Sequence, residues 1–597
     1  MGDTYIYDDN EGDHNADNPL NWLPTRLVVP GNGDIIDIVE GLANSPSSPI
    51  SLIGGAVFHF NITTAYSNQI NLGAFVNGTG GTPDLIGDVT LNNALAECSV
   101  SIVPISGNLV VTAGWLDVYV NVAGTASITG LVYFKNGVVA TGKITVNAGG
   151  YVEVFGTVYA VGGVDCAGTV KLYDGNAVLD CGAAFTATAN CTIDWNGGEI
   201  MGIVNANGFT ITHTNVSAGS NIVVDTDGTL NFGSTDAALD GLDISTGAGL
   251  TTATLGAVLR CGALAHAVGT IATANFAVTC AAWSLANGST FTGGTSAISC
   301  TSFTMPGGTL TGSGAITVAG NISITGGTQS HTGTWTASGT AGSTINTTSY
   351  LRKLTKLVLD GSYTANGEVD TKWFAGAGSL ALGANALAVW ENWTFTGTVT
   401  TTSTGFVRIS DTASYTFASP INVSVPLHLR PNGNYVFTMG AAVSCTALTV
   451  SAYSTTVPGS VVLNGGSSLG AVTMGEAAGT NRIGSLTFGA GNHALTSITR
   501  AGTNTSAVTL SAGAILRASG TITGTGITVT NNGGRINCDG TGRVTAVAVT
   551  GSRLCVYGAR GGTLGTQVRG WNQDSCTNGV RHYPRRTICA CMGLMTP

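Results

Sequence analysis

The sequence contains few charged side chains and few prolines. Asp, Glu, Lys and Arg make up 9% of its 597 residues, against roughly 25% in typical soluble proteins. A collagen triple helix is excluded, because it needs glycine at every third position and the glycines here follow no such period. The many Val, Ile and Thr residues argue against intrinsic disorder, since disordered chains are poor in β-branched side chains and rich in charge.

Long apolar runs are also missing. The mean hydropathy is +0.30, but no segment approaches the roughly 20 apolar residues of a membrane helix. We therefore expect no membrane insertion. The first residues carry neither the basic nor the apolar region of a secretory signal, which favours folding in the cytoplasm.

Known catalytic and metal-binding spacings are absent from the sequence. The eight His residues form no HExxH or HxH motif, and no phosphate-binding loop or nucleophile elbow is found. Residues 244–359 contain no Asp or Glu, whereas glycan hydrolysis needs two carboxylates at a fixed separation. For the acids between 225 and 243 we favour turn positions over a calcium or glycan-cleaving site. We expect no enzymatic activity, no catalytic residue, no cofactor and no bound metal.

The few charges gather at the two ends of the chain. Residues 1–20 hold six acids and no base, and residues 551–597 hold six Arg and one acid. The net charge of −10 argues against nucleic-acid binding, because phosphate contacts need a basic surface. We assign attachment to a particle or surface to Asp8, Asp9, Glu11, Asp13 and Asp17. We assign closure of the tip or contact with a partner to Arg569, Trp571, Arg581, Tyr583, Arg585 and Arg586.

Between these ends the chain alternates apolar and polar side chains in short runs that Gly, Asn or Ser interrupts. A two-residue alternation indicates β-strands, and no capped helical period of 3.6 residues accompanies it. A six-residue period connects Val146, Val152, Val158, Val164 and Val170. The first four of these valines are each followed, four residues later, by Gly150, Gly156, Gly162 and Gly168. Such a pattern fits coils with short straight faces and fixed turn positions.

A longer repeat is marked by cysteine. The pattern apolar-x-Cys occurs at 259–261, 278–280 and 298–300, with spacings of 19 and 20 residues. A repeat of this length is one coil of a solenoid, and stacked coils bury a core that no single coil could bury. Side chains two apart share a face of a strand, so these thiols point inward. At ~4.8 Å between coils they lie too far apart for the roughly 3.8 Å Cβ separation of a disulfide.

We therefore expect free, buried thiols, which implies folding in a reducing compartment. The expectation covers Cys166, Cys261, Cys280, Cys300 and Cys445. The cysteines of the last segment are compatible with zinc binding, with disulfides or with free thiols.

The sequence thus predicts an all-β protein: an elongated parallel β-solenoid (β-helix) with coils of about 20 residues and irregular capping ends. We divide it into an acidic N-terminal cap and attachment arm (1–45), two solenoid parts (46–348 and 349–550) and an Arg- and Cys-rich C-terminal cap (551–597). The inner boundary precedes the basic cluster at 350–361, which an interrupted coil or a partner contact would explain.

The residues that begin the solenoid carry a family resemblance. Asn21-Trp22, followed by Pro-Gly-Asn-Gly-Asp-Ile-Ile at 30–36, resembles the first coil of repetitive β-helical surface proteins, and residues 354–361 resemble their internal coils. The body is similar in style to phage fibre and tail-spike shafts, autotransporter passengers and filamentous adhesins. This resemblance implies a non-enzymatic structural and binding rod.

The missing signal and the unpaired thiols favour a virion component, such as a phage fibre, spike or capsid-attached protein, that contacts a host surface. Its place would be the virion or extracellular surface after folding in a reducing cytoplasm. A bacterial cell-surface adhesin or filament subunit is the alternative, and a β-helical polysaccharide lyase or hydrolase the second alternative. We expect a homo-oligomer, with a trimer as one form. Other virion or surface proteins and a host-surface glycan are the expected partners.

Overall fold

The computed structural model describes residues 85–558 except 102–103, 233–240, 348–353, 412, 453–458, 477–483, 503–504, 524–525, 539–542, 546–547, 552–553. It also describes six outlying strands, β1 (Thr4–Tyr7), β2 (Trp22–Leu23), β3 (Ile35–Ile38), β4 (Val57–Ile62), β5 (Ile70–Asn71) and β60 (Ala590–Met592). The described residues form strands and turns and no α-helix. Two compact units are present, residues 1–300 with 306–312 and residues 301–305 with 313–597.

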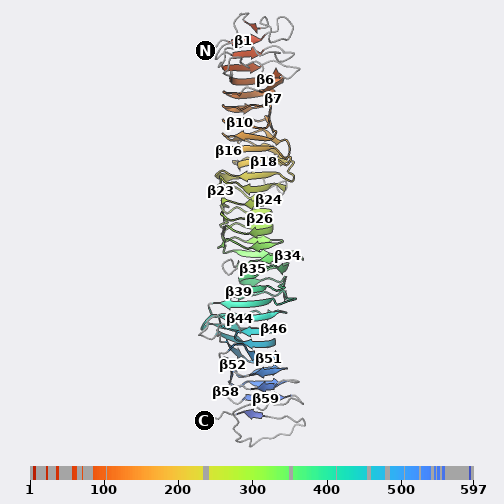
Figure 1. The fold of residues 1–597 in the computed structure, drawn as a ribbon, viewed down its shortest axis with the longest axis vertical. Coiled ribbons are helices and arrows are strands. Elements are labelled where there is room, and N and C mark those ends of the chain that lie inside the picture. The colour runs from red at the N-terminus through yellow and green to blue at the C-terminus, as the bar shows by residue number, and fades with distance from the viewer. Residues whose placement is uncertain are drawn as a thin grey trace. The chain divides into compact units, whose positions relative to one another are not determined.

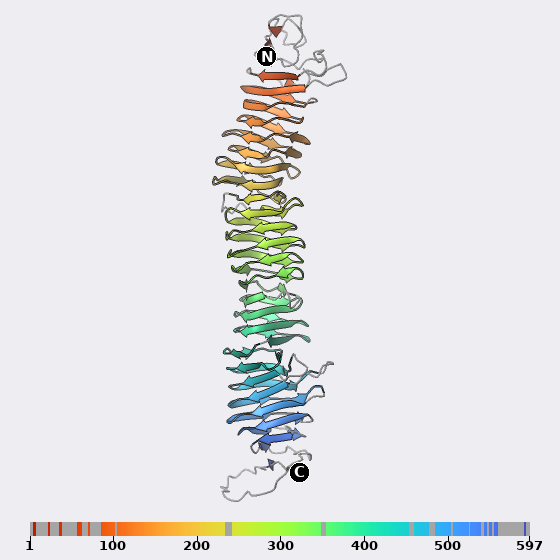
Figure 2. The ribbon, with the colours of Figure 1, turned by 90° about the vertical axis from the view of Figure 1, so that its left-hand side faces the viewer.

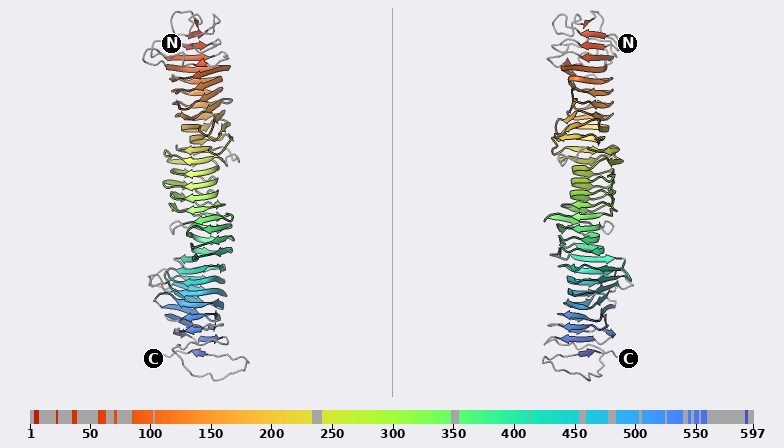
Figure 3. Two further views of the ribbon diagram at one scale, coloured as in Figure 1. Left: turned by 45° about the vertical axis from the view of Figure 1, so that its right-hand side comes forward. Right: turned by 180° about the vertical axis from the view of Figure 1, so that it is seen from behind.

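Each unit is a parallel β-solenoid, in which strands of successive coils lie side by side (Figures 1 and 2). The two units contain about 21 turns of about 20 residues, so the predicted fold class is confirmed. Figure 3 shows the same coils from two further sides. The predicted boundary at 348/349 stays a prediction. The strand that follows it, β35 (Leu354–Leu359), pairs in parallel with β33 (Thr334–Ala337) and with β37 (Val369–Ala375).

A coil of the first unit contributes three short strands. One coil consists of β11 (Ile144–Val146), β12 (Tyr151–Val154) and β13 (Thr157–Ala160). The next consists of β14 (Val164–Cys166), β15 (Thr169–Leu172) and the first part of β16 (Val178–Ala187). In register, Val152 lies opposite Val170 and Val158 opposite Leu179. The six-residue period is therefore one strand plus one corner, and three such steps complete a coil.

Later coils use longer strands that continue around a corner. In the first unit these include β24 (Leu259–His266) and β26 (Val278–Leu285), beside a separate parallel series of β21 (Gly228–Leu230), β23 (Thr252–Leu255), β25 (Gly269–Ala272), β27 (Ser289–Thr292) and β29 (Thr309–Thr311). In the second unit one face is built from β37, β39 (Ala386–Trp393), β41 (Phe406–Asp411), β44 (Pro426–Pro431), β46 (Val443–Val450) and β48 (Ser467–Met474).

The inward side chains are apolar and almost fully buried. Val132, Val152, Val170 and Ile193 follow one another in register across four coils, and each is at most 2% exposed. Columns of this kind run through both units, because parallel pairing places equivalent residues of successive coils above one another. The core is thus built from short stacked columns rather than from elements that pack across one another.

Eight cysteines of the described residues are free and buried: Cys98, Cys166, Cys181, Cys191, Cys261, Cys280, Cys300 and Cys445. They include all five thiols that the sequence placed inward, so that expectation is confirmed. Cys261 lies directly opposite Cys280 in the register of β24 and β26. Burial raises the pKa of the Cys445 thiol to about 12, which keeps it protonated at neutral pH.

Glycines stack on one another at the corners of the coils. A Cβ added to Gly142 would lie 2.3 Å from the carbonyl oxygen of Gly124 in the preceding coil, and Gly162 stacks in turn on Gly142. Gly150 and Gly168 form another column with the same 2.3 Å approach to a carbonyl oxygen. Glycines that the sequence spaces six residues apart therefore occupy successive corners. An added Cβ would meet the backbone of the preceding coil at Gly150, Gly162 and Gly168, and the Asn136 side chain at Gly156.

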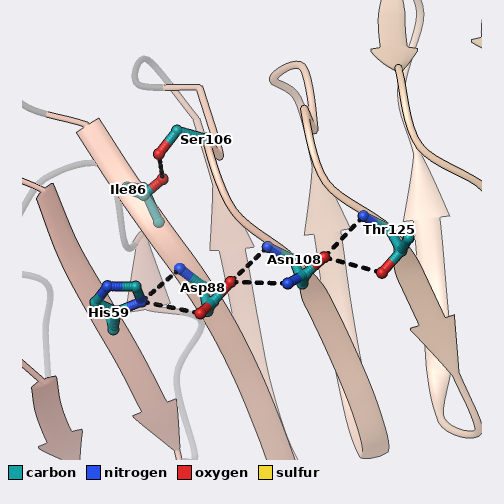
Figure 4. Close-up of polar contacts among 6 residues, drawn as sticks. All are labelled: His59, Ile86, Asp88, Ser106, Asn108 and Thr125. Atoms are coloured by element: carbon teal, nitrogen blue, oxygen red, sulfur yellow. Dashed lines mark hydrogen bonds and ion pairs between the residues drawn. The ribbon is translucent and has the colours of Figure 1, made fainter.

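Side-chain oxygens also link the corners of neighbouring coils, as Figure 4 shows. The Asp88 carboxylate accepts hydrogen bonds from the Asn108 backbone N–H at 2.7 Å, and the Asn108 side-chain oxygen accepts from the N–H and hydroxyl of Thr125 at 3.0 and 2.9 Å. His59 adjoins Asp88 with its Nδ1 at 3.2 Å from the carboxylate. The same bond to the next coil recurs at Asn121, Asn136, Asn190, Asn275 and Asn321. These bonds satisfy backbone donors where strands begin.

Antiparallel strands lie at both ends of the chain. β2 pairs antiparallel with β1, and β60 pairs antiparallel with β59 (Leu554–Gly558). On their other edges β1 and β59 pair in parallel with β3 and β56 (Arg535–Cys538). The first and last parallel strands are thereby covered, which agrees with the expected irregular caps and with the need to protect open sheet edges. None of the described residues belongs to a helix long and apolar enough to cross a membrane.

The glycine columns predict that alanine destabilises the fold at one glycine position and is tolerated at another. We expect Gly142→Ala to lower the free energy of unfolding by about 1–3 kcal/mol, because the new methyl group overlaps the Gly124 carbonyl. Gly175→Ala is the matched control, since its nearest atom would lie 3.7 Å away. Urea unfolding followed by circular dichroism measures both variants. Equal stability of the two would contradict the proposed backbone contact.

A buried histidine predicts a pH dependence of the first unit. His266 is fully buried, its Nε2 lies 3.0 Å from the Gly269 carbonyl oxygen, and burial lowers its pKa from 6.5 to about 4. Between pH 6.5 and 4 the unfolded chain binds a proton that the folded chain excludes, so stability falls as pH falls through this window. The loss is about 3 kcal/mol.

His266→Gln removes this titration. Unfolding of the wild-type chain and the variant, measured at pH 7 and near pH 4, should differ in pH dependence by that amount. An identical acid response of the two proteins would rule His266 out as its source.

Candidate binding surface

One outward face of the first unit concentrates aromatic and charged side chains. It is formed by β7 (Leu109–Val118), β9 (Leu131–Phe134), β12 and β15, which pair in parallel register. The alternation of each strand places Leu116 and Val118 in the core and turns Trp115 and Asp117 outward. A chain with only 7% aromatic and 9% charged residues thus gathers both kinds on four consecutive coils.

Four aromatic rings, one from each coil, line up on this face. Ring centroids are 5.2 Å apart between Trp115 and Tyr133, 5.7 Å between Tyr133 and Phe155, and 4.2 Å between Phe155 and Tyr173. We call these four residues the aromatic ladder. Its end rings Trp115 and Tyr173 are 36% and 51% exposed, and Tyr119 beside it is 52% exposed. Exposed rings gathered in this way are typical of a contact surface.

Two ion pairs lie among the rings. Lys135 Nζ is 3.2 Å from the Asp117 carboxylate, and Lys171 Nζ is 2.9 Å from the Glu153 carboxylate. Asp117 and Glu153 are only 6% and 5% exposed, although their positions point away from the core. A buried carboxylate needs a neutralising partner. Lys135 and Lys171 are therefore needed to stabilise Asp117 and Glu153 in the folded chain. The four charges cancel, so the surface is aromatic and locally neutral.

Lys135 also contacts the rings. Its Nζ lies 4.0 Å from the Phe155 centroid and 5.1 Å from that of Tyr133. A cation over a ring face is attracted by the negative quadrupole of the ring. The indole Nε1 of Trp115 donates a hydrogen bond of 3.4 Å to Asp117. Ring positions and ion pairs therefore hold one another in place.

The electrostatics of the face follow from these contacts. Burial, then the nearby Glu153 and Asp117 carboxylates, raise the pKa of Tyr133. Burial and Glu153 likewise raise the pKa of Tyr151. The hydrogen bond to Glu153 raises the pKa of Lys171. The phenols are thus neutral and the lysine charged at neutral pH, and the phenol hydroxyls remain hydrogen-bond donors.

A second polar group lies on the second unit. Arg408 Nη2 is 2.7 Å from Glu368 Oε1, and Trp390 Nε1 donates to Asp370 Oδ1 at 3.0 Å. A neighbouring set joins His428 Nε2 to Ser451 Oγ at 2.6 Å and to Glu476 Oε1 at 2.9 Å. In a Ser-His-acid triad the acid and the serine contact different ring nitrogens, whereas both contact Nε2 here. Ser451 is also fully buried, so the set has the form of a partly buried hydrogen-bond network.

Of the acids at 225–243, Asp227 and Asp243 bond to the next coil, and Asp236 and Asp240 lie outside the described residues. The Asp227 carboxylate accepts from the backbone N–H of Thr251 and Thr252 at 2.8 and 2.7 Å, and Asp243 accepts from that of Ala263 at 2.7 Å. Burial raises the pKa of Asp225. Among the described residues no three His, Cys, Asp or Glu side chains converge in a way that could hold a metal ion.

The attachment and tip residues proposed from the sequence lie outside the described residues. They are Asp8, Asp9, Glu11, Asp13, Asp17, Arg569, Trp571, Arg581, Tyr583, Arg585 and Arg586. Sequence reasoning missed the aromatic ladder. Its signal was present as spacings of 18, 22 and 18 residues between successive ring residues, close to the length of one coil.

The ion pairs of the ladder can be tested through stability. We expect Lys135→Met to lower the free energy of unfolding by about 2–3 kcal/mol, because it leaves the buried Asp117 carboxylate without the cation that neutralises it. Lys143→Met is the matched control: Lys143 pairs with Asp165 at 3.0 Å, but their side chains are 49% and 25% exposed. Its loss should stay below about 1 kcal/mol. Chemical denaturation of both variants gives the comparison, and equal losses would refute a special role of Lys135.

No family model, no curated protein and no solved structure matches the chain.

Proposed function

We propose that the chain is a non-enzymatic structural and binding solenoid of a virion surface, and that its aromatic ladder contacts a glycan on the host. The observation that carries this proposal is the set of exposed rings at the two ends of the ladder, Trp115 and Tyr119 on the coil of β7 and Tyr173 after β15. Fixed rings at regular spacing favour contact with a repetitive partner over chemistry on a single bond.

A glycan suits the composition of this surface. Sugar rings present apolar C–H faces that pack on aromatic rings, and their hydroxyls bond to polar groups at the ring edges. Tyr and Trp provide both kinds of contact with little loss of conformational freedom. The ladder is also held rigid by the coils beneath it, which lowers the entropy cost of binding.

The free thiols support the virion assignment over the adhesin alternative. Eight buried cysteines form no disulfide, as expected of a chain that folds in a reducing cytoplasm. Assembly into a particle in the cytoplasm avoids the oxidising compartments that an exported adhesin crosses. Attachment through the acidic arm, partner contact through the Arg-rich segment and homo-oligomerisation remain predictions.

The glycan contact can be tested with single-ring variants. We expect the purified chain to bind host-surface glycans on an array, and Trp115→Ala or Tyr173→Ala to weaken that binding about tenfold, as loss of an exposed anchor does. Tyr435→Ala is the matched control, because Tyr435 is 39% exposed and lies in the other unit. Unchanged binding in the ladder variants, with melting temperatures as in the wild type, would refute the assignment.

A further inference from the structure

We propose that the aromatic ladder selects a neutral, unbranched glycan that extends along the stacking direction of the coils, over about four sugar units. This inference rests on the proposed glycan-binding function and specifies its ligand. It follows from three features of the first unit: the pairing of its cations, the spacing of its exposed rings and the polar groups at those rings.

The cations of this region are already paired. Residues 85–259 contain three Lys, no Arg and 14 acids. The three lysines, Lys135, Lys143 and Lys171, each form an ion pair with a carboxylate, at 3.2, 3.0 and 2.9 Å. An acidic sugar would therefore meet no cation that is not already engaged, and it would approach a region with an excess of negative charge. Acidic glycans are disfavoured for both reasons.

Basic sugars gain little from the ladder either. The carboxylates within it, Asp117 and Glu153, are almost fully buried and bonded to lysines. A sugar ammonium group could reach them only by displacing Lys135 or Lys171. A neutral ligand leaves both ion pairs intact, so the ladder disfavours acidic and basic sugars alike.

The exposed rings set the length and direction of the ligand. Trp115 and Tyr119 belong to the coil of β7, and Tyr173 follows β15, three strand steps away through β9 and β12. Parallel strands are ~4.8 Å apart, a distance similar to the length of one pyranose ring in an extended chain. A disaccharide can contact one end of the ladder only, whereas about four units contact both ends.

The polar groups at the rings favour hydroxyls as partners. The exposed Tyr119 and Tyr173 each carry a phenol oxygen, which donates and accepts hydrogen bonds. Between them Tyr133 and Phe155 are partly buried, and Lys135 Nζ lies 5.1 and 4.0 Å from their ring centroids. An unbranched chain fits this pattern, because a branch would separate the sugar faces from the inner rings.

The test uses the full chain and unbranched gluco- and manno-oligosaccharides of two, four and six units, with uronic-acid and amino-sugar oligomers of matching lengths. We expect affinity for a neutral oligomer to rise about tenfold from two to four units and to change little from four to six. Tyr173→Ala should abolish that gain without altering disaccharide binding at the other end. Binding should be insensitive to salt, because it involves no unpaired charge. Tyr435→Ala again provides the control.

The possible outcomes distinguish the proposed ligand class from the glycan-binding function itself. Preference for charged oligomers, salt-sensitive binding or no length dependence would overturn the ligand class and leave the glycan-binding function standing. Absence of ladder-dependent binding to any glycan would overturn both. If sedimentation shows that the chain self-associates and Tyr173→Ala makes it monomeric, the ladder binds a second copy and the glycan assignment is wrong.

Discussion

The register of the parallel strands governs everything else in this protein. Each coil donates and accepts backbone hydrogen bonds with the coils before and after it, so residues at equivalent positions lie directly above one another at ~4.8 Å. The side chain at one position must therefore fit the side chains above and below it in the same column. Inward columns must be apolar, as at Val132, Val152 and Val170. Corner columns must be small or hydrogen-bonded across coils, as at Gly124 and Gly142.

The same constraint explains the scarcity of charge. Like charges directly opposite one another on neighbouring strands repel, and a repeated coil would place them there at every turn. Thr, Ser and Asn avoid this repulsion and still bond between coils. Where charges occur on the ladder face, one column runs Asp117, Tyr133, Glu153, Lys171 and Asp194 in register. The acids at Asp117 and Glu153 are separated by a ring and neutralised by lysines.

The aromatic ladder is a product of this columnar geometry. Four ring residues that lie about one coil apart in the sequence become neighbours with centroids 4.2–5.7 Å apart. No loop has to be ordered to bring them together, because the coils beneath already fix their positions. A solenoid can thus build an extended, rigid contact surface from a few substitutions at neighbouring outward columns. The polar networks of the second unit, around Arg408 and His428, use the same neighbour relations to satisfy polar groups instead.

The sequence by itself determined the strand alternation, the coil length of about 20 residues, the inward thiols and the presence of caps. These features depend on local periods, which parallel stacking carries into the structure unchanged. It did not determine which outward residues become neighbours, since that depends on corner lengths that vary from coil to coil. The ladder residues are spaced by 18, 22 and 18 positions, and only the three-dimensional register shows that Trp115, Tyr133, Phe155 and Tyr173 share one face. The pairing of Lys135 with Asp117 was decided in the same way, because the two residues belong to different coils and meet only after those coils have stacked.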